Sequence, residues 1–196
     1  MKRTLFAAAI AMSMVLSTPA AYADTITFNA VLGGAFENPA VISAGTGFAT
    51  VVLNTTANTL FLDVTFSGLT GNTTASHIHC CVAPGGNAGV ATQTPSFVNL
   101  PLGVTSGHFT QTLDLTLASS YNPAFVTAQG GVAGAEAALV AGMEAGNSYL
   151  NIHTTTSPGG EIRGLLAPTP EPSSLLLLGT GLLGLAGTGV RLRKKT

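Results

Sequence analysis

Apolar and polar residues alternate along most of the chain between residues 25 and 166, and this period of two is typical of β-strands with one buried face. Clusters of glycine, proline and asparagine separate the alternating segments. The strands that the pattern predicts span residues 25–32, 48–53, 59–66, 75–80, 107–117, 148–154 and 161–166. Residues 133–145 are instead rich in alanine, with Leu139 and Met143 at helical spacing. The expected fold class is all-β, a Greek-key-like β-sandwich with one short helix.

The first 23 residues have the pattern of a targeting segment rather than of a folded element. Lys2 and Arg3 precede an apolar run, and small residues lead up to Ala23. This order is typical of a secretory signal peptide. We expect signal peptidase to cleave between Ala23 and Asp24.

The last segment, residues 168–196, also departs from the alternating pattern. It contains Pro170, Glu171 and Pro172, then an apolar run over 175–190 and a basic end. The run is short for a membrane span, which usually needs about 20 residues, but it suits a hydrophobic helix with its basic end in the cytoplasm. We therefore expect three parts: the signal peptide (1–23), the folded domain (24–167) and a membrane-anchoring tail (168–196).

The charge of the domain excludes one class of partner. Charged residues make up 8% of the chain, against about 25% in ordinary soluble proteins. Between residues 24 and 167 there are seven acidic residues and one basic residue, Arg163, which gives a net charge of −6. An acidic surface opposes nucleic-acid binding and docking on anionic lipid.

Three histidines are the candidate metal ligands. His77 and His79 lie two residues apart in a predicted strand, so their side chains share one face, while Ile78 faces the core. His153 has a similar position in a second predicted strand, whereas His108 opens a different one. If the first two strands are neighbours, three imidazoles converge and could hold copper or zinc. The alternative is a polar stripe in which the histidines bind backbone carbonyls.

Two further pairs of residues have a structural interpretation. Cys80 and Cys81 are the chain's two cysteines, and in an exported protein they could form a disulfide, remain free thiols or assist the histidines as ligands. Glu161 and Arg163 are two apart in a predicted strand and could face the same side. We expect Arg163 to pair with a carboxylate and to fix geometry rather than to catalyse.

Much of the domain resembles the CHRD domain, the module first named in chordin. The matching motifs are Phe28-Asn29-Ala30, Glu37-Asn38-Pro39-Ala40-Val41, Phe66-Ser67-Gly68-Leu69-Thr70, Ala75-Ser76-His77-Ile78-His79, Tyr149-Leu150-Asn151-Ile152-His153-Thr154 and Pro158-Gly159-Gly160-Glu161-Ile162-Arg163-Gly164. The chain departs from the pattern at Cys80 and Cys81, where many relatives carry Gly-Pro. The resemblance implies an extracellular module and supplies no catalytic residues. A weaker likeness, through the two histidines on one strand and a later third, is to the Cu/Zn superoxide dismutase sandwich.

The tail resembles a PEP-CTERM sorting signal through Pro170, Glu171 and Pro172, the apolar run and the basic end. That resemblance implies processing by an exosortase-like enzyme and a place at the bacterial cell surface or in the exopolysaccharide or biofilm matrix. We therefore expect an exported, non-enzymatic protein that is anchored transiently in the inner membrane, with matrix polysaccharide or surface proteins as partners. The alternative is a secreted copper- or zinc-binding protein. A carbohydrate-binding module has little support, because the chain has no Trp and three Tyr to stack on sugars.

Overall fold

The structure of the chain is a computed structural model that describes residues 25–169 and 180–181. The predicted signal peptide with its cleavage point (Ala23, Asp24), the sorting residues Pro170, Glu171 and Pro172, and the predicted hydrophobic helix lie outside the described residues. Within the part that is described, no helix combines the length and the apolar character that crossing a membrane requires.

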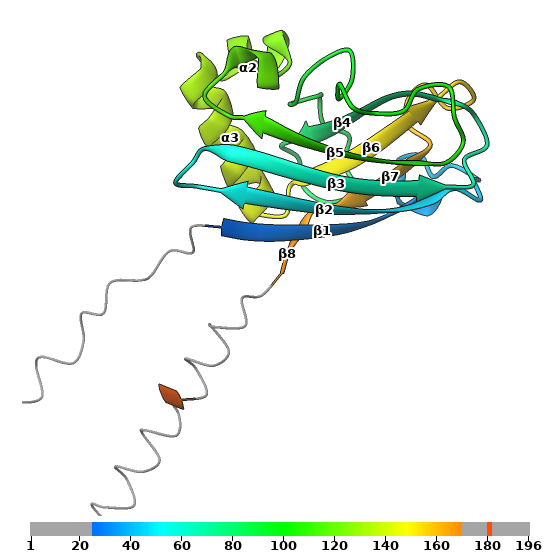
Figure 1. Cartoon of the computed structure of the whole chain (residues 1–196), viewed down its shortest axis with the longest axis horizontal. Coiled ribbons are helices and arrows are strands. Elements are labelled where there is room, and N and C mark those ends of the chain that lie inside the picture. The colour runs from blue at the N-terminus through cyan, green and yellow to red at the C-terminus, as the bar shows by residue number, and fades with distance from the viewer. Residues whose placement is uncertain (1–24, 170–179, 182–196) are drawn as a thin grey trace, which may run out of the picture.

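Eight antiparallel strands form one curled sheet, a half-barrel (Figure 1). The strands are β1 (Thr25–Gly33), β2 (Thr46–Asn54), β3 (Thr59–Ser67), β4 (Thr73–Cys80), β5 (Gly107–Asp114), β6 (Ser148–Thr154), β7 (Ile162–Leu165) and β8 (Ala167–Pro168). Their order across the sheet is β4-β6-β7-β1-β2-β3-β5, with β8 beside β1. The all-β prediction is confirmed, and α3 (Val132–Glu144) is the expected helix.

The core follows from the alternation within each strand. In β3, for example, Leu60, Leu62 and Val64 are fully buried, while Phe61, between the first two, is 38% exposed. Side chains of α3, including Leu139, join the same cluster, and the helices gather at one end of the sheet (Figure 1). In β1, β2, β3 and β5 one apolar face therefore turns inward and the opposite face is more exposed. Most of β4 and all of β6 are instead buried on both faces.

Two elements differ from the prediction, and each has a local cause. The strand β5 ends at Asp114 and not at residue 117, because the Asp114 carboxylate accepts from the amide of Thr116 and turns the chain. The short helix α2 (Pro123–Ala128) was not predicted. Asn122 caps it by accepting from the amide of Ala124, and Pro123 occupies the first position, which is a common way for a helix to begin.

The long segment 81–106 between β4 and β5 covers the open side of the sheet. Ala91 and Phe97 donate their amides to carbonyls of β4, at 3.0 and 3.2 Å. Further along, the Asn99 side chain donates to the carbonyl of Thr110 in β5 at 2.7 Å. The segment thus contacts both edge strands and lies directly beside the histidines of β4.

Candidate metal centre

The three predicted histidines meet on two neighbouring strands. In the antiparallel pair β4·β6, His79 lies opposite Tyr149, and His153 lies opposite Ala75. His77 and His79 face one side, and Ile78 is fully buried in the core behind them. One ring nitrogen from each of the three histidines lies within 4.8 Å of the other two. The closest pair, His79 Nε2 and His153 Nε2, is 3.4 Å apart.

Backbone carbonyls fix which nitrogen of each ring carries the proton. His77 Nε2 donates to the carbonyl of Pro95 at 2.7 Å. The Nδ1 atoms of His79 and His153 donate to the carbonyls of Ala88 and Pro158, at 2.9 and 3.0 Å respectively. A carbonyl oxygen can only accept, so in the neutral rings the lone pairs sit on His77 Nδ1, His79 Nε2 and His153 Nε2.

Burial keeps these rings neutral. The three side chains are between 6% and 9% exposed. Burial lowers the pKa of His79 to about 4, against the raising effect of its bond to Ala88. Burial also lowers the pKa values of His77 and His153. Neutral imidazoles are the form that binds metal ions, so the cluster is ready for a cation at neutral pH.

The spacing fits one ion better than it fits a hydrogen-bond network. A tetrahedral ion with bonds of about 2.0–2.1 Å to nitrogen places its ligands about 3.3 Å apart. The two Nε2 atoms already match that separation, and a ring nitrogen of His77 lies within 4.8 Å of a nitrogen of each of the other two rings. Within the described chain, the Nδ1 atom of His77 is buried without a hydrogen-bond partner. Three acceptors that face one another without a donor are costly unless a cation joins them.

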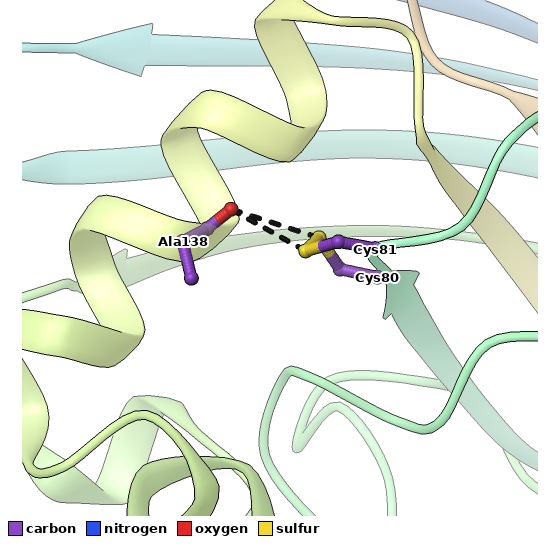
Figure 2. The surroundings of a disulfide bond; sticks show 3 residues. All are labelled: Cys80, Cys81 and Ala138. Carbon is purple, nitrogen blue, oxygen red and sulfur yellow. Dashed lines mark hydrogen bonds between the residues drawn. A yellow bond between two sulfur atoms is a disulfide. The ribbon is translucent and has the colours of Figure 1, made fainter.

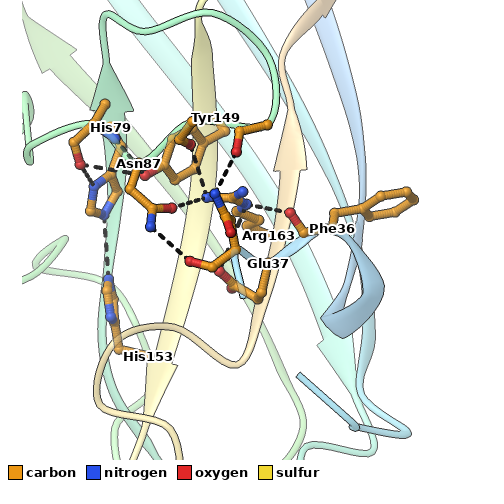
Figure 3. A network of polar contacts seen from close by, with 11 residues as sticks. Phe36, Glu37, His79, Asn87, Tyr149, His153 and Arg163 are labelled. Atoms are coloured by element: carbon orange, nitrogen blue, oxygen red, sulfur yellow. Dashed lines mark hydrogen bonds and ion pairs between the residues drawn. The ribbon is translucent and has the colours of Figure 1, made fainter. Parts of the chain in front are cut away.

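A stack of side chains supports the cluster from one side. The ring of Tyr149 lies parallel to that of His79, with centroids 4.9 Å apart. The guanidinium of Arg163 lies 4.6 Å from the Tyr149 centroid, and Figure 3 shows the tyrosine between the two. Hydrogen bonds to carbonyls and such packing orient metal-binding histidines in known sites. The sequence pattern did not single out Tyr149, although it lies opposite His79.

The two cysteines form a disulfide on the other side of β4 (Figure 2). Their sulfurs lie 3.8 and 3.3 Å from the carbonyl oxygen of Ala138 in α3. They also lie against Gly142, where a Cβ would come within 2.3 Å of the Cys80 sulfur. Of the three possibilities left open by the sequence, the structure has the disulfide. Its sulfurs pack against α3 and leave the histidines as the converging ligand set.

Glu161 and Arg163 are buried but do not pair with each other. The carboxylate partner of Arg163 is Glu37, with Nε 3.7 Å from Oε2. Glu161 accepts hydrogen bonds from five surrounding groups instead. They are the hydroxyls of Ser43 (2.6 Å), Thr154 (2.7 Å) and Thr156 (3.4 Å) and the amides of Thr70 (2.5 Å) and Gly71 (3.1 Å). Burial raises the pKa of Glu161, but these donors lower it more, to about 2. Glu37 follows a turn 126 residues before Arg163, so no local pattern marks it.

The fourth histidine stays apart from the cluster. His108 Nε2 lies 2.8 Å from an oxygen of Asp63, and both side chains are about half exposed. This surface pair joins β3 to β5, at the edge of the sheet opposite β4.

Comparison with known families agrees with both resemblances noted in the sequence. The sequence model of the family described as CHRD domain matches residues 28–166. The model of the PEP-CTERM protein-sorting motif matches residues 168–194. No curated protein and no solved structure matches the chain.

Proposed function

The chain belongs to the CHRD domain family, and from this premise we propose that it is a non-enzymatic protein of the bacterial cell surface or extracellular matrix that binds copper or zinc through its three clustered histidines. The PEP-CTERM motif marks the protein for an exosortase-type sorting system and for export to the cell envelope or surface. Signal peptidase cleavage and transient anchoring in the inner membrane complete the proposed route. Matrix polysaccharide and surface proteins are the proposed surroundings.

One observation supports metal binding above all others. One ring nitrogen from each of His77, His79 and His153 lies within 4.8 Å of the other two, and one nitrogen of each ring is hydrogen-bonded to a backbone carbonyl. In histidine metal sites, one ring nitrogen binds the metal and the other donates a hydrogen bond to an acceptor that orients the ring. Imidazole nitrogens suit copper and zinc.

The proposed role is structural rather than catalytic. All three ligand side chains are at most 9% exposed, and the segment 81–106 supplies two of the carbonyls that hold them. Three protein ligands leave a fourth position on a tetrahedral ion, and the burial of the ligands limits the access of a substrate to that position.

Metal content of the purified protein tests the proposal. After loading with zinc or copper at neutral pH and removal of excess ion, elemental analysis should find one equivalent per chain. His153→Ala and His79→Ala should each lose that equivalent. His108→Ala is the matched control, because it removes an exposed histidine outside the cluster, and it should keep the ion. Wild-type protein without stoichiometric metal, or a control as depleted as the cluster variants, contradicts the proposal.

Deletion of residues 168–196 tests the sorting arm separately. The truncated protein should be fully secreted, because the deletion removes the matched sorting motif and leaves the whole CHRD match, residues 28–166, intact. Fractionation of cells and medium measures the outcome. A truncated protein that remains in the membrane fraction places the anchor elsewhere.

A further inference from the structure

A cavity of about 670 Å³ is lined in part by Arg163, which Figure 3 shows on the side of Tyr149 away from His79. Its walls come from β1, the turn after it, the segment 82–86 and β7, and Tyr149 and Arg163 are among the residues that line it. The volume is within the range of small-molecule sites in proteins. The proposed metal site does not use this space.

Arg163 lines the cavity and has one guanidinium nitrogen that makes no hydrogen bond to the described residues. The side chain is 5% exposed, and Arg163 is the only Lys or Arg between residues 24 and 167. Its Nε donates to the carbonyl of Phe36, and its Nη1 donates to the carbonyl of Gly86 and to the side chain of Asn87. In the described part of the chain, Nη2 makes no hydrogen bond. Because Arg163 lines the cavity, an acceptor placed there can reach this nitrogen.

The charge of Arg163 is only partly balanced by protein groups. Glu37 contacts it through one atom pair, Nε and Oε2, at 3.7 Å, rather than through a parallel pair of hydrogen bonds. Burial raises the pKa of Glu37 to about 7, although Arg163 and Asn151 lower it. A buried cation with an incomplete partner favours a further anion beside it.

The mouth of the cavity is apolar. Val31 is 63% exposed, Phe36 is 54% exposed and Leu165 is 39% exposed, and all three line the cavity. Val31 and Leu165 belong to the adjacent strands β1 and β7. Exposed apolar residues that surround a polar floor are typical of a site for a ligand with one charged end.

We propose that this cavity binds a small organic carboxylate with an apolar body, its carboxylate on Arg163 and its body against Val31, Phe36 and Leu165. A carboxylate oxygen can accept a charge-assisted hydrogen bond from Nη2 of Arg163. An apolar body buries the hydrophobic rim. A sugar acid lacks the apolar body and gains only the charged contact.

Calorimetric titration of the purified metal-free protein with three probes tests both halves of the proposal. Octanoate carries both features, octanamide lacks the charge and glucuronate lacks the apolar body. Octanoate should bind, and each of the other two probes should bind at least about tenfold more weakly. Equal binding of octanamide contradicts the role of Arg163, and equal binding of glucuronate contradicts the role of the apolar rim.

Two variants test whether octanoate binds in this cavity. Arg163→Gln removes the charge and should weaken octanoate binding at least about tenfold. Since Arg163 is buried and its replacement could unfold the protein, Val31→Glu provides a second test: it puts a carboxylate at the exposed mouth and should also abolish binding. Val98→Glu, at a residue that is 76% exposed and outside the cavity lining, should bind like wild type. Unchanged binding by Val31→Glu overturns the proposal.

His153→Ala separates this inference from the proposed metal function. That variant should lose metal and keep octanoate binding, because the histidine does not line the cavity. Loss of both ligands in a folded His153→Ala protein contradicts a separate carboxylate site.

Discussion

The surroundings of Glu161 and the three-histidine cluster are both buried and polar, yet they differ in the balance of donors and acceptors. Glu161 is fully buried, and each of its oxygens accepts at least two hydrogen bonds. The histidine cluster has three ring nitrogens that face one another, and the hydrogen-bond donors around them are directed elsewhere. Groups of the chain satisfy the hydrogen-bond acceptors of Glu161, whereas the facing nitrogens of the histidine cluster have no cation beside them within the described chain.

This difference separates a structural polar group from a candidate binding site. A buried carboxylate surrounded by donors stabilises its loops and needs nothing else. A buried group of acceptors without a donor is retained at a cost in stability, and such costs are common at functional sites. Burial and polarity are the same in both places, so hydrogen-bond balance is the property that distinguishes them.

Removing the Glu161 carboxylate gives the largest expected effect. Glu161→Ala removes the acceptor of five donors, two of them the backbone amides of Thr70 and Gly71. We expect the free energy of unfolding to fall by about 3–5 kcal/mol. Urea denaturation measures the change, and Glu144→Ala, at an exposed position on α3, is the control. A loss no larger than that of the control would contradict the idea that Glu161 holds its surrounding loops together.

Acid should destabilise the two sites in different pH windows. The pKa of Glu161 in the folded protein, about 2, lies below its usual value of 4.5. Its contribution to stability, about 3 kcal/mol, is therefore full above pH 4.5 and disappears as pH falls towards 2. The folded pKa of His79, about 4, lies below 6.5, so its contribution is full above pH 6.5 and disappears as pH falls through 4. Unfolding free energies measured in metal-free buffer from pH 7 to pH 2 should show both losses. Glu161→Gln should abolish only the lower one, and a single unchanged curve would refute the assignment.

Bound metal should stabilise the folded protein, and only through the histidine cluster. At a free ion concentration of 100 times Kd, a ligand that binds only the folded state adds roughly 2.7 kcal/mol to the free energy of unfolding. Thermal unfolding with and without zinc should show this gain in wild type and in Glu161→Gln, but not in His77→Ala. A gain that survives in His77→Ala would mean that the ion binds elsewhere.

Substitution of Tyr149 should have the smallest effect on stability. It tests how much the side chains around the histidines contribute to metal binding. Tyr149→Phe keeps the ring against His79 but removes a hydroxyl that accepts from the amide of Ala88 at 3.1 Å. We expect a loss of about 1 kcal/mol in unfolding free energy and a modest fall in metal affinity. Tyr149→Leu also removes the stack and should weaken metal binding further. Identical affinities for the two variants would show that the stack has no part in holding His79.

Most of the sheet could be predicted from sequence because its information is local. The alternation that predicts residues 148–154 describes β6 residue for residue, and β1 to β4 differ by one or two residues at their ends. The side-chain period of a strand also placed His77 and His79 on one face. The helix α2 was missed although its signature, Asn122 followed by Pro123, was present in the sequence.

What could not be predicted depends on distant contacts. The pairing of β4 with β6, which brings His153 to His79, joins segments more than 70 residues apart. Nothing in the spacing of Glu37 indicates that it meets Arg163, and the carbonyls of Ala88, Pro95 and Pro158 have no side-chain signature. The three histidines could be identified from the sequence. Which nitrogen of each ring carries the proton could not, because the carbonyls that decide it come from loops that are placed only in the folded protein.

The last hydrogen bond of the domain has a consequence for its processing. The amide of Thr169 donates to the carbonyl of Thr27, next to the β8 pairing with β1, and Pro170 of the sorting signal follows at once. One residue of chain spans at most about 3.6 Å. A cut between Pro170 and Pro172 would therefore fall within about 11 Å of the sheet, and the released product would end close to the folded domain.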